Sequence, residues 1–508
     1  MAATKSHASP LFDPYSDPAH PTNAWPAWRR HAMLATLAFQ AFSANYAAGA
    51  HLTIFPQMSE YFGVSIEAIA NSIGISILGL GVGSLLWCPL AQAIGHRPVY
   101  LIAWTFFVPC AFWMAFAKDY STFAAGRFFA GFAGSISQVL PATSIAALYK
   151  PEWRGTAVSV WALLLIMGPP AAPLITSAVT LAHEWQYCYY VVIIFVGVEW
   201  FLVFAFCGET LYTPPQHATP ISIAATSTAE EASDEDHKGD KEKEDAVHTS
   251  TRDDLEGARG GQQQGHVGYL YNPLRDPMRF LKAAAQPLAM ACYVSVLLPC
   301  LWAAVAFGWS VGTTIILPQV LHAPAYDFGP ILIGCAFLAI LVGSVIGKIC
   351  GGIISDRTVT FLATRNGADG VRRPEYRLWA LLLPTLILLP AMILFGYGWA
   401  DRMAWWVSIV FGAGLYYIGN VAVSSIVQTY IAENDISRSM SSVSVFNFTK
   451  CVFSFGVPFY LPSWTEEGTF KSSYLAQGLI VSLLGLAMLG GLIAFGGRLR
   501  RWQGLPTA

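Results

Sequence analysis

Long apolar stretches alternate with short polar breaks along most of the chain. A helix needs about 20 apolar residues to cross the hydrocarbon core of a bilayer. Runs of that length lie near 32–56, 68–91, 98–117, 122–148, 156–180 and 187–207. Six more lie near 288–320, 330–354, 377–399, 404–431, 439–461 and 474–497. The pattern predicts an all-α polytopic membrane protein whose twelve crossings fall into two groups of six.

A polar segment separates the two groups. It includes AEEASDEDHKGDKEKEDAVHTSTRDDLEGARGGQQQG, which is highly charged and nearly free of large apolar side chains. Such a segment buries too little surface to offset its ordering entropy, so we expect a largely disordered linker that is either a plain tether or a regulatory segment. The predicted parts are an N-terminal tail (1–31), a six-helix bundle (32–210), this linker (211–284), a second bundle (285–498) and a C-terminal tail (499–508).

The composition agrees with a membrane protein and excludes several other classes. Of the 508 residues, 55% are hydrophobic and 12% are charged, about half the charged share of a soluble domain. The net charge of −2 favours no nucleic-acid partner. The nine cysteines occur singly, without a CxxC or Cys/His cluster, so we expect no metal site, no cofactor and no disulfide framework. No Ser/His/Asp set suggests an enzyme.

The basic residues predict the orientation in the membrane. Lys and Arg are concentrated in cytoplasmic loops of membrane proteins. One side of the predicted topology holds Arg29, Arg30, Arg97, Lys150, Arg154, Arg357, Arg365, Arg372, Arg373, Arg377, Arg438, Arg498, Arg500 and Arg501. The other side holds only Lys118, Arg402 and Lys471. We therefore expect both termini and the linker to be cytoplasmic.

The two groups of helices resemble each other in sequence. IFPQMSEYFG (54–63) corresponds to ILPQVLHAPAYDFG (316–329), and PLAQAIGHR corresponds to GGIISDR about 35 residues later in each half. RGTAVSVW (154–161) corresponds to RSMSSVSVF (438–446). Three matches in the same order predict a duplicated six-helix unit, and transporters built from repeats bind their substrate near the bilayer midplane between the halves.

Four motifs carry a resemblance to a known family. PLAQAIGHRPVYL, AGRFFAGFAGS (125–135), MGPPAAP (167–173) and GETLYTP (208–214) are similar to PLSDxxGRRPVYL, GRFLQGxxGS, GPxxGP and PETYxP. Over about 30–500 the chain resembles the major facilitator superfamily, and within it the fungal twelve-helix drug:proton antiporters.

The resemblance implies a function. It implies proton-coupled export of a small organic compound, such as a drug, toxin or secondary metabolite, by alternating access. The alternative is proton-coupled uptake of a small solute such as a polyamine or an organic acid, because Ala171-Ala172 replaces the Gly that is usual before Pro173. The expected partners are the small-molecule substrate, protons and the lipid bilayer, and we expect a monomer in the plasma membrane.

The same motifs nominate gating residues. Gln92 stands where the family usually has an Asp, which would sit against the positive N-terminus of helix eleven. The second copy keeps Asp356 and Arg357, which we expect to face Arg154. The charged latch is therefore predicted to survive in one half only. The full gating set is Gln92, Gly95, Arg97, Arg154, Gly168, Pro169, Glu209, Asp356 and Arg357.

Charged residues inside the predicted spans are candidates for mechanism, because burying a charge in a membrane is costly. Arg127 matches the family arginine implicated in proton coupling. Glu199 is an acidic residue well inside a span and suits a proton carrier, although a hydrogen-bonded or lipid-edge position explains it equally well. Lys348, in GSVIGKICGG, lacks the spacing of a phosphate loop and is interpreted as a lysine that reaches toward the cytoplasm.

Polar and aromatic residues near helix midpoints make up a predicted substrate pocket. Lys450 lies deep in helix eleven and suits an anionic or carbonyl group. Aromatic residues also form interfacial belts and packing contacts, so we expect only part of the set to line the pocket. The nominees are Asn45, Tyr46, Gln138, Trp161, Trp309, Tyr416, Tyr417, Asn420, Asn447 and Lys450.

Overall fold

The structure is a computed structural model that describes residues 21–211, 277–365, 374–434 and 438–503. Its first half consists of η2 (Pro21–Ala24), α1 (Ala27–Gly49), α2 (Phe55–Phe62), α3 (Ile66–Ile94), α4 (His96–Ala115), α5 (Tyr120–Gly134), α6 (Ile136–Val139), α7 (Pro141–Leu148), α8 (Pro151–Val179) and α9 (Gln186–Phe206). Its second half consists of α12 (Pro277–Ala291), α13 (Val294–His322), α14 (Pro330–Arg365), α15 (Tyr376–Ala380), α16 (Leu382–Ala400), η3 (Val407–Gly414), α17 (Leu415–Asn434) and α18 (Ser439–Trp502). The described ranges contain no strand, which confirms the all-α class.

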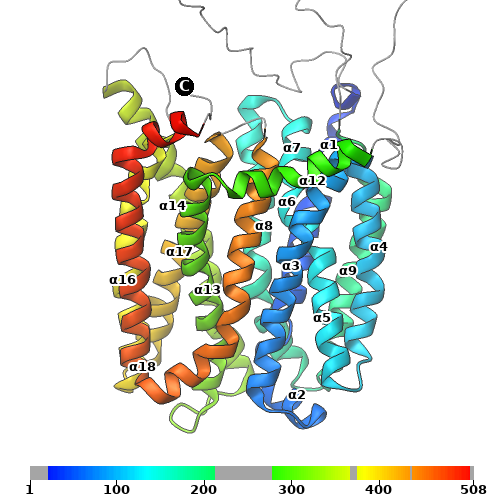
Figure 1. The fold of residues 1–508 in the computed structure, drawn as a ribbon. Helices are drawn as coiled ribbons and strands as arrows, with labels where there is room; N and C mark the ends of the chain where they lie inside the picture. Colours follow the sequence, from blue (N-terminus) through cyan, green and yellow to red (C-terminus); the bar gives the residue numbers. More distant parts are fainter. Residues whose placement is uncertain (1–20, 212–276, 366–373, 435–437, 504–508) are drawn as a thin grey trace, which may run out of the picture.

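The long helices run side by side through one bundle (Figure 1). Ten of the described helices are long and apolar enough to cross a membrane. α1 and the part of α18 before Thr469 are more polar but pack along the same bundle, α1 against α8 and α18 against α3. α18 is two helices joined at Thr469, whose φ of 65° is not helical. Figure 1 shows α18 running to one end of the bundle and then returning toward the other.

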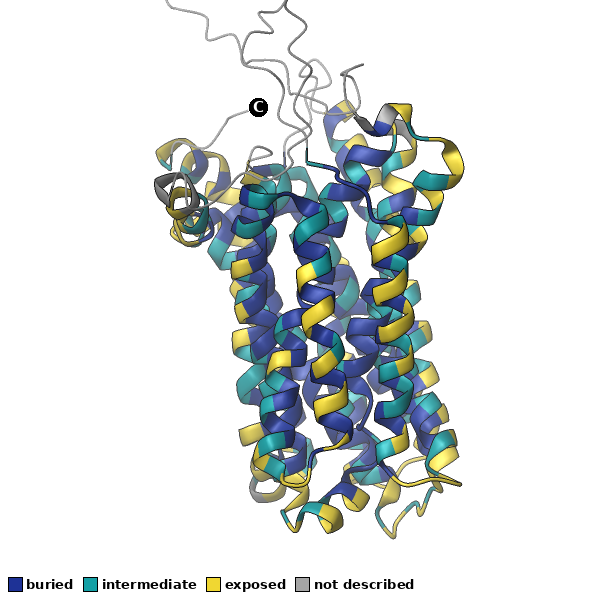
Figure 2. Ribbon diagram, turned by 90° about the vertical axis from the view of Figure 1, so that its right-hand side faces the viewer, coloured by how far each residue is buried: buried dark blue, intermediate teal, exposed yellow. Residues whose placement is uncertain are grey.

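The outer surface of the bundle is apolar. Figure 2 shows exposed residues along the outward faces of the long helices and buried residues between them. On α9, Ile194, Phe201 and Phe204 are each more than half exposed. Contiguous apolar surface of this kind is unfavourable in water. It fits a chain whose surroundings are hydrocarbon.

Small residues allow close contact between helix backbones. A Cβ atom at Gly343 of α14 would come within 3.0 Å of η3 backbone atoms, and one at Gly347 or Gly351 would come within 3.0 Å of α17 backbone atoms. The spacing of four residues places these glycines on one face of α14. Lipid offers no hydrophobic drive for helix association, so close van der Waals contact takes its place. The three glycines thus let α14 lie close to η3 and α17.

α1 and α8 approach each other closely at the Gly-Pro-Pro sequence. A Cβ at Gly168 would lie 2.8 Å from both Asn45 Cβ and the Phe42 carbonyl oxygen, and one at Gly49 would lie 2.7 Å from the Pro169 carbonyl oxygen. α8 continues as one helix through Pro169 and Pro170. A proline has no N–H, so each leaves the carbonyl four residues earlier without its helical donor.

α12 differs from the sequence prediction. We expected the linker to extend to residue 284 and the seventh helix to begin near 288. The structure has a separate helix, Pro277–Ala291, followed by a break at Cys292 and Tyr293 before α13. α12 lies across one end of the bundle, over α3 and α18 (Figure 1). Its 15 residues are too short to cross a membrane. The rest of the predicted linker lies outside the described residues.

Two pairs of long helices make the most extensive contacts between the halves. α3 packs against α18, where a Cβ at Gly74 would meet the Phe455 carbonyl oxygen at 2.6 Å and one at Gly81 would meet Cys451 Cβ at 2.8 Å. α8 packs against α14, where Gly334 lies against Ser177. The end of the bundle that holds α12 and the short turn between α3 and α4 is called the linker end below. The halves enclose space between these two seams.

Candidate substrate cavity

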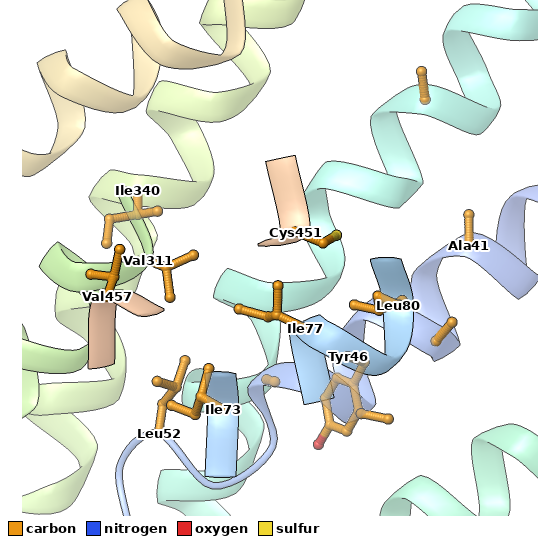
Figure 3. Close-up of a cluster of buried hydrophobic side chains, with 14 of the residues drawn as sticks. Ala41, Tyr46, Leu52, Ile73, Ile77, Leu80, Val311, Ile340, Cys451 and Val457 are labelled. Carbon is orange, nitrogen blue, oxygen red and sulfur yellow. The ribbon is translucent and has the colours of Figure 1, made fainter. Parts of the chain in front are cut away.

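A cavity of about 210 Å³ lies between the two halves. The first half contributes an apolar wall, and Figure 3 shows its Leu52, Ile73, Ile77 and Leu80 opposite side chains of the second half. Pockets that hold drug-sized ligands usually measure roughly 300–1,000 Å³. In this conformation the cavity therefore suits a small molecule, or a larger one after the halves separate.

Most of the predicted pocket residues line this cavity. They come from both halves, on α1, α6, α8, α17 and α18. The cavity is lined by Asn45, Gln138, Trp161, Tyr417, Asn420, Asn447 and Lys450, together with the gating nominee Pro169. Their roles in substrate binding stay predictions, but the fold brings these residues together around one cavity.

Three aromatic nominees lie outside the lining and are packing residues instead. Tyr46 is fully buried and packs edge-on against Phe195, with ring centroids 4.9 Å apart. Tyr416 is also fully buried, and its hydroxyl donates to the Ala306 carbonyl oxygen at 2.7 Å. The Trp309 indole N–H donates to a tyrosine hydroxyl of α18 at 3.1 Å. Packing was the alternative for aromatic residues, and it describes these three.

An amide network connects α1 and α6 on the first-half side. Gln138 Nε2 donates to Asn45 Oδ1 at 3.2 Å, and Asn45 Nδ2 donates to the Ala41 carbonyl oxygen at 2.8 Å. The Trp161 indole N–H donates to the Ser137 carbonyl oxygen at 3.1 Å. These hydrogen bonds fix the orientation of the three side chains. The first-half lining therefore includes a preorganised, neutral polar patch beside its apolar residues.

Two lysines of the second half line the cavity. Lys348 Nζ donates to Ser425 Oγ at 2.9 Å. Lys450 Nζ lies 4.6 Å from the centroid of the Phe307 ring and 5.6 Å from that of Phe446, within the range of a cation–π interaction. Lys348 was expected to reach the cytoplasm, and that interpretation is wrong because its side chain lies at the central cavity.

Arg127 lies inside the first half, outside the cavity lining. It is 1% exposed, and its two terminal nitrogens donate to the carbonyl oxygens of Ala47 at 2.6 Å and Ala48 at 2.7 Å. These carbonyls belong to the last turn of α1, where helix oxygens lack intrahelical donors and the dipole is negative. Thr176 Oγ1 satisfies the next such group, the Ala50 carbonyl, at 2.7 Å.

Glu199 is buried on α9, whose neighbours are α4 and α1. Its side chain is fully buried and does not line the cavity. Neither carboxylate oxygen has a hydrogen-bond partner in the part of the chain that the structure describes. The lipid-edge and hydrogen-bonded alternatives are therefore wrong. A role for Glu199 in proton coupling stays a prediction.

The linker end of the first half is held by Glu209. Its carboxylate accepts the backbone N–H groups of His96 at 3.0 Å and Arg97 at 3.2 Å, at the start of α4. A carboxylate at this position caps the helix and complements its dipole. Gly95 makes the turn between α3 and α4 with φ 98°, a conformation that favours glycine. Gln92 Nε2 lies 3.8 Å from Met440 Sδ, in the first turn of α18 as expected.

The matching region of the second half uses an ion network. Asp356 pairs with Arg377 at 2.9 Å, and Arg377 also binds both oxygens of Glu433 at 2.6 and 2.7 Å. This network ties α14 to α15 and α17 inside one half. Arg357 is exposed beside it, and Arg154 lies in the first turn of α8. Asp356 was expected to face Arg154, but its ion pair is with Arg377. The gating roles stay predictions.

Part of the polar lining was not predicted from the sequence. Ser424 and Gln428 follow the predicted Asn420 at intervals of four on α17, and Ser344 precedes Lys348 by four on α14. That spacing places each set on one helix face. The spacing could have indicated a polar helix face. Serine is common in apolar helices, however, so its presence alone does not mark a cavity.

Comparison with known proteins decides the family. Residues 37–452 match the family model described as the Major Facilitator Superfamily. The chain belongs to this superfamily. The MFS-type transporter penM of Penicillium rubens is 26% identical over 86% of this chain and 79% of its own length. The efflux pump radE of Floropilus chiversii is 22% identical over 96% of this chain and 84% of its own length.

Solved structures have the same fold. The xylose transporter XylE of E. coli, in a partially occluded inward-open conformation, has a TM-score of 0.61 at 12% identity and covers 92% of this chain and 98% of its own. A peptide transporter POT has a TM-score of 0.58 at 11% identity and covers 92% and 95%. The superfamily member described here is therefore a multi-pass membrane transporter and not an enzyme, as the sequence predicted.

Proposed function

We propose that this transporter exports a small organic compound by alternating access, driven by a proton gradient. The observation that carries the proposal is the cavity between the halves, which takes its lining from both of them. A site at the interface of two repeats can face either side of a membrane as the halves rock. The efflux pump radE among the relatives supports export.

The two seams support rocking of the halves as units. α3 against α18 and α8 against α14 are contacts between long helices with small residues at the closest points. Within each half, hydrogen bonds and ion pairs hold the linker end together, through Glu209 in one and Arg377 in the other. In this proposal Gln92 and Asp356 bias which end of the cavity is closed.

Proton coupling is assigned to Arg127 and Glu199. Neither lines the cavity, so they act through the helices that do. Arg127 binds the carbonyl of Ala48, and Ala48 itself lines the cavity. A change of charge near Arg127 would therefore move the α1 wall. Glu199 is a buried carboxyl on α9, which packs against the same helix.

The linker end is proposed to face the cytoplasm, since most Lys and Arg residues of the predicted loops belong to that side. With this orientation the transporter would act as a monomer in the plasma membrane. Epitope tags at the two ends of the chain, probed in intact and permeabilised cells, test the orientation. Labelling of either tag in intact cells contradicts it.

Reconstituted vesicles test the proposed function. The purified protein is placed in liposomes with an imposed pH gradient of either direction, and uptake of a panel of acidic, neutral and cationic compounds is measured. Export predicts accumulation on the side from which protons leave. Accumulation with the opposite dependence indicates uptake instead, and flux that ignores the gradient removes proton coupling.

A further inference from the structure

The charged residues that line the cavity are all positive. Lys348 on α14 and Lys450 on α18 both line it, and no Asp or Glu is part of the lining found for the described ranges. Neither lysine forms an ion pair with any carboxylate that the structure describes. Two ammonium groups in one cavity without a counter-charge repel each other, and each lowers its free energy when an anion enters.

The contacts of the two ammonium groups leave donors unused. An ammonium group has three N–H donors. Lys348 uses one toward Ser425 Oγ, and Lys450 is compensated by the faces of Phe307 and Phe446 rather than by an acceptor. At the wall of a largely apolar cavity such a charge is less well solvated than in bulk water, so pairing with an acceptor is favourable. An acceptor carried by a ligand would complete both.

Neutral donors extend the same wall. Asn447 lies one turn before Lys450 on α18, is 4% exposed and lines the cavity. Its Nδ2 has no acceptor among the residues that the structure describes. Asn420, 2% exposed, lines the cavity from α17. The second half thus presents two charges and an unused amide donor.

The first half adds an apolar surface to the lining. It is formed by Leu52, Ile73, Ile77 and Leu80, together with Pro169. A small inorganic ion would leave this wall without contacts, whereas the hydrocarbon part of an organic molecule would bury apolar area against it. The two walls together describe an amphipathic ligand.

We propose that the cavity binds an organic anion, with its carboxylate at Lys348 and Lys450 and its apolar part against the first-half wall. This inference rests on the proposed function and names its substrate class. It excludes polyamines, whose charges would be repelled by the two lysines. It leaves the direction of transport to the vesicle experiment.

Binding to the purified protein in nanodiscs, without any gradient, tests the inference. The probes are hexanoate, octanoate and 3-phenylpropionate, each compared with its primary amide and with the amine of equal chain length. Charge-assisted hydrogen bonds contribute enough for about a tenfold or greater preference for the carboxylate over the amide. Weaker binding of every carboxylate than of its amide, or no carboxylate binding at millimolar concentration, overturns the inference.

Variants locate the preference. Lys348→Met and Lys450→Met should each reduce carboxylate selectivity, the double variant should abolish it, and Lys450→Arg should retain part of it. Lys471→Met is the matched control, since Lys471 pairs with Asp401 outside the cavity, and it should bind like the wild type. Full selectivity in the double variant places the anion elsewhere and refutes the site.

Two further experiments distinguish this inference from an inorganic-anion site and from the proposed function. Inorganic phosphate is tested as a competitor, and tighter binding of phosphate than of any carboxylate would replace the organic anion by an inorganic one. Gradient-driven flux of neutral or cationic compounds that survives in the double lysine variant would leave the proposed function standing and remove the anion site. Selective carboxylate binding without gradient-driven flux would support the anion site and contradict the proposed function.

Discussion

The two halves of this transporter bury their charges in different ways. In the first half, Arg127 and Glu199 lie inside the bundle, away from the cavity, and Arg127 satisfies the carbonyl end of α1. In the second half, Lys348 and Lys450 lie at the cavity and have no carboxylate partner among the described residues. A duplicated fold therefore does not give its copies the same chemistry.

The difference distinguishes charges that bind other groups of the protein from charges that are available to bind a ligand. A buried charge whose donors are used by the protein stabilises the fold, and its loss leaves the partners unsatisfied. A partly buried charge with unused donors adds little to the stability of the empty protein. The same substitution by methionine should therefore have unequal effects on stability in the two halves.

Arg127→Met should give the largest loss of stability. It would leave the carbonyl oxygens of Ala47 and Ala48 without these donors, at a cost of about 1–3 kcal/mol for each buried unsatisfied group. Thermal unfolding of the purified protein measures this. Lys450→Met is the paired variant and should unfold at the wild-type temperature or above. Equal losses in both variants would remove the contrast between the halves.

Gly168→Ala should give the next largest effect. Its Cβ would lie 2.8 Å from both Asn45 Cβ and the Phe42 carbonyl oxygen, which forces α1 away from α8. Such overpacking costs about 1–3 kcal/mol. Gly456→Ala on α18 is the control, since nothing lies within 4 Å of the added atom, and it should be neutral or slightly stabilising. A neutral Gly168→Ala contradicts the rigid α1–α8 contact.

Glu209→Ala should cost about 1 kcal/mol, the usual value for a helix cap. The N–H groups of His96 and Arg97 would lose their acceptor at the start of α4. Unfolding temperature and transport rate are both measured, and Glu209→Gln, which keeps an acceptor oxygen, should recover part of the loss. If Glu209→Gln is as damaged as Glu209→Ala, the carboxylate has a role other than capping.

The smallest effects are expected at Gln92 and Asp356. Gln92→Asp would place a carboxylate beside the first turn of α18, an interaction of about 0.3–1 kcal/mol, and should shift the transport rate modestly. From the sequence, Asp356→Asn should harm transport more than Gln92→Ala. The Asp356 side chain is 74% exposed, so its ion pair contributes only about 0–1 kcal/mol. Indistinguishable rates for these two variants would remove the predicted asymmetry of the latch.

Much of the fold could be predicted because a helix that crosses a membrane requires an apolar run of about 20 residues, which can be recognised in the sequence. The apolar runs were readable along the chain, and most of them coincide with long helices of the bundle. The repeated Pro-Gln lies in the short helix α2 in one half and inside α13 in the other. α12 was missed since a short Ala-rich helix beside a polar linker has neither the length nor the hydropathy of a span. The candidate site was predicted in part, from polar residues at helix midpoints.

The sequence by itself determined the all-α class and the membrane setting, since hydrocarbon requires long apolar segments with satisfied backbones. Only the tertiary structure decided which charges meet the cavity. Lipid and protein interior are both apolar, so these helices lack the strong polar stripe that shows which face points inward. For that reason Glu199 and Lys348 look alike in sequence, and the fold buries one between helices and brings the other to the cavity.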